Sequence, residues 1–107
     1  MNPETFQQLD KVIHERGRMA IISLLAASPD HSFTDLRDTL SMTDGNLTTH
    51  LKTLQQAGYV AVAKSYRNSR PLTTCALTPE GRKAFSEYVG LLDKIVRQAR
   101  GTKDFRE

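Results

Sequence analysis

Several residue types are scarce in this sequence of 107 residues, and each scarcity removes a class of function. Cys75 is the single cysteine, which excludes a disulfide framework and a thiolate pair for metal binding. The three histidines lie far apart in the chain, so no His/Asp cluster can be recognised, and we expect no metal or other cofactor. Tryptophan is absent and aromatic residues make up 7% of the chain, which disfavours a surface that stacks unpaired RNA bases.

Catalytic motifs and membrane signals are also missing. The sequence has no glycine-rich phosphate loop, no HExxH pattern, no nucleophile elbow and no cysteine with a histidine close by, so we do not expect an enzyme. The longest apolar run, residues 19–27, is interrupted by a serine and is far too short to span a bilayer. The polar N-terminal residues lack the apolar segment of a secretory signal, and we therefore expect a cytoplasmic protein.

Acidic residues are absent from one long window. Between Gly45 and Pro79 there is no Asp or Glu, although the chain contains 12 of them. Four cations fall in the same window: Lys52, Lys64, Arg67 and Arg70. The net charge of +3 is modest, but the concentration of positive charge in this window predicts contact with an anionic partner such as a nucleic acid. The alternative is a chance gap in the acidic residues.

The window begins inside residues 43–60, which predict a capped helix followed by a strand. Thr43 suits the N-cap, Asp44 lies at the positive end of the helix dipole, and Gly58 suits the position just after the helix. One face is apolar through Leu47, Leu51 and Leu54. The opposite face has small polar groups, one lysine and no acid: Gly45, Thr48, Thr49, Lys52 and Gln56, flanked by Asn46 and Thr53. His50 lies at the edge of the leucine face, where helix packing and a DNA contact are equally open.

The chain before this stretch predicts three further helices. Residues 2–14 are expected to form one helix, opened by the sequence Asn-Pro-Glu. Gly17 should interrupt the chain before a second helix, which is apolar on nearly every side and is expected to be the central buried one. Phe33 is expected in a very short strand, and Ser32 or Thr34 should cap a short third helix. Almost no loop separates that helix from the next, which predicts a helix-turn-helix.

After Gly58 the apolar period changes from helical to alternating, which predicts a β-hairpin. The expected strands are residues 59–66 and 72–77, joined by a turn that carries two arginines. Residues 78–80 read Thr-Pro-Glu, a helix-start signature, and open a long helix that should reach about Arg100.

The long C-terminal helix carries an apolar stripe that is broader than a domain of this size can easily cover. We therefore expect a second copy of the chain to pack on it, although packing within one chain is the alternative. The expected dimer interface includes the N-terminal helix and comprises Phe6, Leu9, Ile13, Phe85, Tyr88, Val89, Leu92, Ile95, Val96 and Ala99.

Two motifs of the sequence resemble those of a known family. The runs TDGNLTTHL and LTPEGR are similar to motifs of the winged-helix transcriptional regulators related to the MarR and ArsR families, especially their minimal single-domain members. The resemblance covers roughly residues 9–96. It implies an α+β, mainly helical, winged helix-turn-helix fold in one domain over residues 1–107, with a core at about 15–80. The N-terminal helix and the long C-terminal helix at 79–100 would serve dimerisation.

The resemblance also implies a DNA-binding site. The helix from Asp44 would enter the major groove of double-stranded DNA, and the hairpin tip would reach the minor groove or the backbone. The implied recognition-helix residues are Asp44, Gly45, Asn46, Thr48, Thr49, His50, Lys52 and Thr53, and the implied wing residues are Lys64, Arg67, Asn68, Ser69 and Arg70. Thr49 departs from the family pattern, since many relatives have arginine there, so base specificity is expected to rest on the threonines, Asn46 and DNA shape.

These observations together predict a homodimeric, sequence-specific, double-stranded DNA-binding transcriptional regulator. The second hypothesis is a winged-helix module that binds an acidic protein partner through the same face and does not bind DNA. Any small-molecule effector, for which the sequence shows no motif, would bind at the dimer interface or between the domain and its long helix. Cys75 is expected to be a small buried hydrophobe rather than a redox switch.

Overall fold

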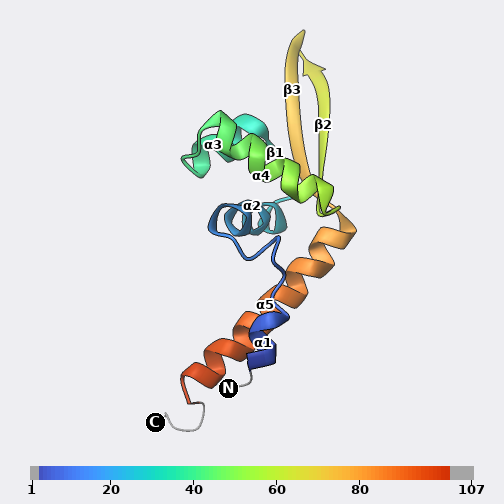
Figure 1. Ribbon diagram of the computed structural model, residues 1–107. Helices are drawn as coiled ribbons and strands as arrows, with labels where there is room; N and C mark the ends of the chain where they lie inside the picture. Colours follow the sequence, from blue (N-terminus) through green and yellow to red (C-terminus); the bar gives the residue numbers. More distant parts are fainter. Residues whose placement is uncertain (1–2, 102–107) are drawn as a thin grey trace.

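The computed structural model describes residues 3–101, which form five helices and a small antiparallel sheet with strand order β1-β3-β2 (Figure 1). In chain order the elements are α1 (Pro3–Gln7), α2 (Arg16–Ala27), β1 (Asp30–Ser32), α3 (Phe33–Thr39), α4 (Asp44–Gln56), β2 (Val60–Arg67), β3 (Arg70–Leu77) and α5 (Pro79–Ala99). This arrangement confirms the predicted winged helix-turn-helix fold. No helix in this described range is long and apolar enough to cross a membrane.

The core lies between α2, α3, α4 and the base of the hairpin. The predicted central helix is confirmed, because α2 contributes three buried side chains, Ile21, Ile22 and Leu25. The three leucines of α4 are also buried, which confirms the apolar face predicted for that helix. The other buried core residues are Ile13 before α2, Leu36 of α3, Val60 of β2, Cys75 of β3 and Tyr88 of α5.

The helix-turn-helix is built by side-chain caps. Ser32 caps α3 by accepting a hydrogen bond from the Asp35 N–H, and Thr43 caps α4 by accepting one from the Asn46 N–H, both at 3.0 Å. Gly58 follows α4 with φ of +82°, the left-handed conformation in which glycine is favoured after a helix. The predicted caps at both ends of α4 are therefore confirmed. The predicted strand at Phe33 is wrong by one residue, because β1 ends at Ser32 and Phe33 begins α3.

The N-terminal helix is much shorter than predicted. It ends at Gln7 instead of near residue 14, and the N-cap predicted at Asn2 lies outside the described residues. The physical reason is Asp10, whose carboxylate accepts hydrogen bonds from the backbone N–H groups of Val12 and Ile13 and so replaces the helical bonds. Helix α2 begins at Arg16, one residue before the predicted interruption at Gly17, and the side chain of Glu15 caps it.

We call β2, β3 and their turn the wing. The strands pair from Val60 opposite Leu77 out to Arg67 opposite Arg70, so the turn is shorter than the predicted residues 67–71. Asn68 and Ser69 alone form it, with φ of 53° and 65°. Positive φ at both central residues is what a two-residue hairpin turn of the favoured hand requires. The wing projects well beyond the helical body (Figure 1).

Helix α5 leaves the body in the opposite direction (Figure 1). Thr78 caps it and Pro79 occupies its first turn, as predicted. Gly81 is required at its root, because a Cβ there would overlap the carbonyl oxygen of Tyr59. Further along, α1 and the segment that follows it lie beside α5 (Figure 1). The molecule is consequently elongated, with principal extents of 60 × 27 × 23 Å.

Candidate nucleic-acid interface

The outward face of α4 is the centre of the candidate interface. Its polar side chains are exposed: Asn46, Thr48, Thr49 and Lys52, preceded by Asp44 and Gly45. A Cβ added at Gly45 would meet no described atom within 4 Å, so close packing of the preceding helix does not explain this glycine. Thr53 is half-buried and its hydroxyl donates to the carbonyl of Thr49, which leaves it less available than its neighbours.

Asp44 is the only acid on α4, and it is paired. The Arg37 guanidinium donates to the carboxylates of Asp38 and Asp44 at 2.9 and 3.0 Å. Hydrogen bonds from Arg37 to Asp38 and then Asp44 raise the pKa of Arg37, so the cation persists at any physiological pH. The acid at the start of α4 is therefore paired and is not a free anion beside the exposed face of this helix. Sequence reasoning missed this role of Arg37, which lies seven positions before its partner.

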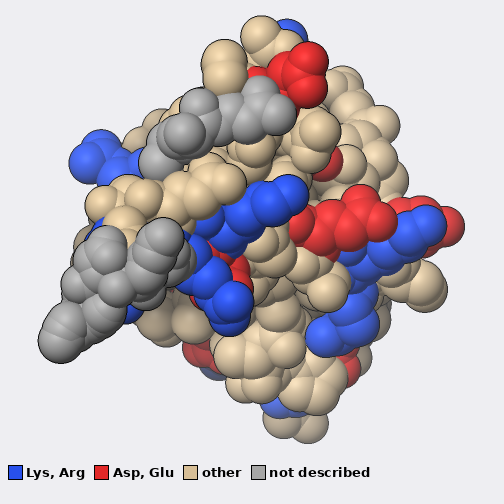
Figure 2. Space-filling view, turned by 90° about the horizontal axis from the view of Figure 1, so that it is seen from below, with Lys and Arg blue, Asp and Glu red and all other residues tan. Residues whose placement is uncertain are grey.

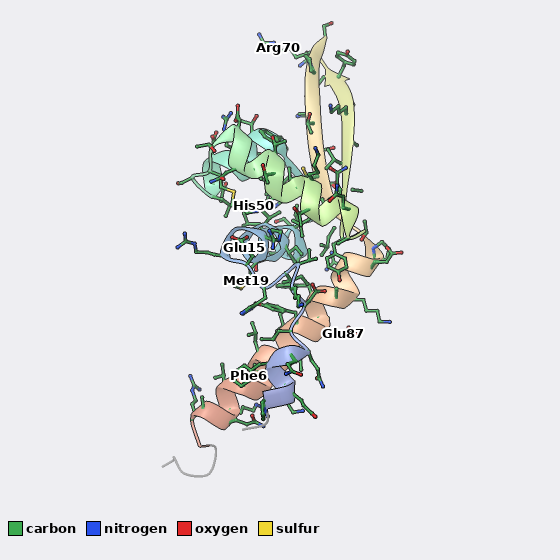
Figure 3. The ribbon with its side chains drawn as sticks, viewed as in Figure 1. Phe6, Glu15, Met19, His50, Arg70 and Glu87 are labelled. Atoms are coloured by element: carbon green, nitrogen blue, oxygen red, sulfur yellow. The ribbon has the colours of Figure 1, made fainter. Side chains whose placement is uncertain are left out.

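His50 turns away from the outward face of α4. Its ring lies between α4 and α2, with Nδ1 3.7 Å from a carboxylate oxygen of Glu15 (Figure 3). The ring fills the space that Gly17 leaves open, since a Cβ at Gly17 would lie 2.7 Å from Nε2 of His50. Of the two roles left open by the sequence, helix packing is the one that the structure supports. The prediction of His50 as a DNA-contacting residue is therefore corrected.

The Glu15 carboxylate joins the start of α2 to α4. It accepts a hydrogen bond of 2.8 Å from the Arg18 N–H and lies 3.9 Å from the Arg18 guanidinium. The bond from the Arg18 backbone lowers the pKa of Glu15, and His50 and Arg18 lower it further by charge. The cap thus favours an ionised carboxylate facing α4.

The predicted wing residues are all exposed: Lys64, Arg67, Asn68, Ser69 and Arg70. Arg67 and Arg70 face each other at the last pair of the ladder, so the two guanidiniums belong to one tip, and Arg70 lies at its far end (Figure 3). Sequence reasoning missed Tyr66, which is 77% exposed on the same hairpin. The signal in the sequence was an aromatic residue directly before the predicted basic turn.

A pocket of about 350 Å³, which we call the helix–wing groove, separates α4 from the wing. It brings together Lys52 of α4 and Lys64 of β2, which are 12 positions apart in sequence. The other lining residues are Phe33, Thr48, Leu51, Gln55, Val62 and Thr73. No carboxylate lines this groove. At the opposite end of the molecule, seen in Figure 2, acidic and basic side chains are mixed.

The predicted dimer face is only partly available at the surface. Ile13 is fully buried and Tyr88 is 1% exposed, both in the core of their own chain, so these two predicted interface residues are corrected. Tyr88 is held there by His14, whose Nδ1 lies 2.7 Å from the tyrosine hydroxyl. Val89 and Val96 are exposed on α5. Phe6 is exposed on α1, and its place is labelled in Figure 3. The other members are half-buried or small: Leu9, Phe85, Leu92, Ile95 and Ala99.

Cys75 is fully buried on β3, as the sequence predicted for a small hydrophobe. Burial raises the pKa of its thiol to about 11, which disfavours the reactive thiolate. Within residues 3–101 no three His, Cys, Asp or Glu side chains gather as a metal cluster would require.

A capped helix with a free polar face, a preceding helix at a tight turn and a basic hairpin beside them define a winged helix-turn-helix. Comparison with known families agrees, because the family described as "Winged helix DNA-binding domain" matches residues 18–96. The chain belongs to this family.

Two known proteins illustrate the relationship. An uncharacterized protein of Methanocaldococcus jannaschii, MJ0432, is 37% identical over 79 residues, which is 74% of this chain and 86% of that protein. The solved structure of a transcriptional regulator homologue from Pyrococcus horikoshii OT3 has a TM-score of 0.84 at 22% identity, covering 90% of this chain and 97% of that one.

A third solved structure shares the fold. NadR, solved in complex with 4-hydroxyphenylacetate, has a TM-score of 0.66 at 24% identity, covering 92% of this chain and 72% of that one. The winged helix-turn-helix fold predicted from the sequence motifs is confirmed.

Proposed function

We propose that this protein is a sequence-specific, double-stranded DNA-binding transcriptional regulator that acts as a homodimer. The observation that carries the proposal is the exposed face of α4, which has small polar groups, Lys52 and no unpaired acid, next to the basic wing. Both surfaces belong to the acid-free window of the sequence. Cations and hydroxyl groups on these surfaces could contact DNA phosphates, and no unpaired carboxylate would repel them.

In this proposal α4 enters the major groove of DNA and determines the base specificity of binding. Asn46, Thr48 and Thr49 stand on its exposed face, and their side chains suit hydrogen bonds to base edges and contacts with thymine methyl groups. The helix has no arginine, so it lacks the strong bidentate contact to guanine. Arg67 and Arg70 at the wing tip would then supply affinity through phosphates or the minor groove.

The homodimer is supported by the apolar side chains that one chain leaves in water. Val89 and Val96 lie seven positions apart on α5, on the same side of the helix, and Phe6 is exposed on the neighbouring α1. A second α5 packed on this face would bury them. Two copies of α4 would then meet successive major grooves, so the binding site is expected to be a near-palindrome with half-sites about 10 bp apart or a multiple of it.

The test is a salt series of DNA binding by the full chain. Fluorescence anisotropy with duplexes of random sequence and with selected genomic fragments should show binding at low salt. The affinity should fall on the order of a thousandfold between about 50 and 200 mM salt if six or more phosphates are contacted. A flat salt response, or no binding to any duplex at low salt, contradicts the proposal. Sequencing of the genomic fragments retained by the protein then identifies the operator.

We place the predicted small-molecule effector in a groove of about 700 Å³ between α5 and the segment after α1. Its lining combines charged and apolar groups, among them Asp10, Leu91, Lys94 and Arg97, and its size lies in the range of ligand pockets. Thermal-shift measurements with small aromatic carboxylates test this, because a bound ligand raises the melting temperature. A compound that stabilises the wild type and Arg97→Gln equally binds elsewhere.

A further inference from the structure

The segment between α1 and α2, residues 8–15, makes two hydrogen bonds to distant parts of the chain, and we call it the strap. Near its start, the Asp10 carboxylate accepts a hydrogen bond from the hydroxyl of Tyr59, which lies 49 positions later, between α4 and β2. Near its end, Nδ1 of His14 lies 2.7 Å from the hydroxyl of Tyr88 on α5. The strap therefore contacts both the root of the wing and the long helix.

The two ends of the strap belong to different parts of the molecule. Its start lies beside α5, where Asp10 lines a groove together with Glu87 and Tyr88 (Figure 1). Its end lies in the helical body, because Ile13 is fully buried in the core. Between the two ends, one oxygen of the Asp10 carboxylate accepts hydrogen bonds from the backbone N–H groups of Val12 at 2.8 Å and Ile13 at 3.3 Å. These bonds give the strap a defined shape.

Tyr59 lies where α4, the wing and α5 meet. Its backbone N–H donates to the carbonyl of Leu54 in the last part of α4, at 3.0 Å. Its carbonyl accepts a hydrogen bond from the backbone N–H of Thr78, the N-cap of α5, also at 3.0 Å. Gly81 packs against the same carbonyl so closely that a Cβ would not fit. A force on the Tyr59 side chain therefore acts directly on this junction.

The Tyr59 hydroxyl remains a hydrogen-bond donor at physiological pH. The hydrogen bond to Asp10, burial and the negative charges of Asp10 and Glu87 raise the pKa of Tyr59 to about 12. Loss of the proton would place a phenolate beside these carboxylates. The bond between the strap and the root of the wing consequently persists over the whole physiological pH range.

A small rotation at this junction would move α4 a long way relative to the far end of α5. The tyrosine side chain carries the bond to Asp10 away from the backbone point at which α5 joins the wing, so the bond opposes rotation about that point. The 21 residues of α5 extend about 30 Å. A rotation of about 10° would therefore shift α4 by about 5 Å, which exceeds the roughly 3.4 Å between neighbouring base pairs.

We propose that Asp10 and Tyr59 are positioning residues that fix the angle between the winged helix-turn-helix and α5, and thereby the spacing of the two DNA half-sites that a dimer accepts. This inference rests on the proposed function as a DNA-binding homodimer. The two residues belong neither to the outward face of α4 nor to the wing tip, so they act through the elements that they hold. Loss of their hydrogen bond should widen the range of accepted spacings and leave the base preference within each half-site unchanged.

The experiment first selects sites for the wild type from a random duplex library, which gives the half-site and its preferred spacing. Fluorescence anisotropy with the full chain then compares this site with duplexes whose spacing is one base pair longer or shorter. Asp10 also lines the proposed effector groove, so no small molecule is added. The wild type should bind the altered duplexes about tenfold more weakly, because DNA or protein must deform to keep both contacts. Tyr59→Phe should bind all three duplexes within about threefold of one another.

Substitutions of Asp10 test the other side of the bond. Asp10→Ala should widen the accepted spacings too, and adding Tyr59→Phe should change the spacing preference no further, because the two residues share one interaction. Asp10→Asn is the conservative variant. Its amide oxygen can accept from the strap backbone and its amide nitrogen can donate to the Tyr59 oxygen, so it should keep the wild-type spacing preference.

The matched control is Tyr66→Phe, which removes the same hydroxyl from an exposed tyrosine on the wing. Whatever its effect on affinity, it should keep the wild-type spacing preference, because Tyr66 lies outside the junction. Circular dichroism and thermal unfolding check that every variant is folded.

The outcomes separate this inference from the function on which it rests. If the wild type binds no duplex at low salt, the proposed function and the inference both fall. If the wild type binds all three spacings alike, or Tyr59→Phe keeps the wild-type ratio of affinities, the positioning role is wrong while DNA binding stands. If Tyr59→Phe weakens binding to all three duplexes by one common factor, the hydrogen bond only stabilises the fold, and the inference is overturned in that case too.

Discussion

Helices α4 and α5 each bury one face and leave the other free, but the two free faces differ in kind. Helix α4 buries three leucines in its own chain and exposes threonines, an asparagine and a lysine. Helix α5 is longer, at 21 residues, and leaves Val89 and Val96 at 45% and 44% exposure. A free face of small hydrogen-bonding groups suits a hydrated, anionic partner, whereas a free face of branched apolar groups suits an apolar one.

The two helices also differ in their charged residues, in a way that fits the same two kinds of partner. Helix α5 carries both signs, including an exposed ion pair of 3.1 Å between Asp93 and Arg97. Helix α4 has one acid, Asp44, and this acid is paired with Arg37. The molecule therefore separates its two proposed contacts, with DNA at the wing end and a second copy at the α5 end. Each of the following changes tests one side of that separation.

The largest effect is expected on α5. A glutamate in place of Val89 or Val96 would place an unpaired charge in the proposed dimer interface, at a cost of about 3–5 kcal/mol and more than a hundredfold in the dimer dissociation constant. Both valines are already half exposed in the single chain, so the monomer fold should persist. Light scattering coupled to size exclusion should report a monomer for each variant and a dimer for the wild type.

The matched control for this change is Gln98→Glu, which adds the same charge at an exposed position of α5 away from the valines. It should remain dimeric at the same concentration. A wild type that is monomeric at tens of micromolar, or valine variants that stay dimeric, would show that α5 is not the interface.

The second effect concerns the choice of bases by α4. Replacing Asn46 or Thr48 with alanine should change the preference at the contacted base pair by about 1 to 3 kcal/mol. Replacing Arg67 and Arg70 with alanine should instead weaken binding to all sequences, because phosphate contacts carry no sequence information. Selection of bound sequences from a random library, repeated for each variant, distinguishes these results. A shifted consensus in the arginine variant would reverse the roles proposed for helix and wing.

Much of the fold follows from local chemistry and was therefore predictable. Thr43 and Thr78 cap helices with their own side chains, and Gly58 ends α4 by its positive φ, so neighbours in sequence determine these boundaries. The predicted length of the N-terminal helix was wrong because the carboxylate of Asp10 accepts hydrogen bonds from the backbone N–H groups of Val12 and Ile13. Apolar periodicity alone does not distinguish a helix from a chain held by such a side chain.

The candidate site was predictable as a charge pattern but not as a shape. The acid-free window identified α4 and the wing tip, whereas the helix–wing groove depends on the register that sets Lys64 opposite Thr73. His50 shows the same limit, because its position at the edge of α4 fits packing or DNA contact, and the gap left by Gly17 decides for packing. His50 and Gly17 are more than 30 positions apart in the chain, so no local pattern connects them.

A smaller effect on stability and DNA binding is expected from replacing one glycine on each helix. Gly45 of α4 and Gly90 of α5 both have open space where a Cβ would be added. Alanine at either position should therefore stabilise the protein by up to about 1 kcal/mol, which urea unfolding would measure. We further propose that the duplex approaches α4 closely at Gly45, so Gly45→Ala should also weaken DNA binding, whereas Gly90→Ala should leave it unchanged. Equal DNA affinity in both variants would remove the close approach proposed at Gly45.

The smallest effect concerns the cap that holds α2 against α4. The pKa of Glu15 is lowered by the hydrogen bond from the Arg18 backbone, so the ionised cap stabilises the folded state above the unfolded pKa of 4.5. Glu15→Ala should therefore lower the free energy of unfolding by about 0.5 kcal/mol near neutral pH. The difference in unfolding free energy between the variant and the wild type should shrink as the pH falls through the lowered pKa of Glu15, because the wild-type carboxylate then becomes protonated and loses its charge. Urea unfolding at several pH values measures this. Glu15→Gln keeps an acceptor for the Arg18 N–H and should lose less, so an equal loss in both variants at neutral pH would assign the effect to charge alone.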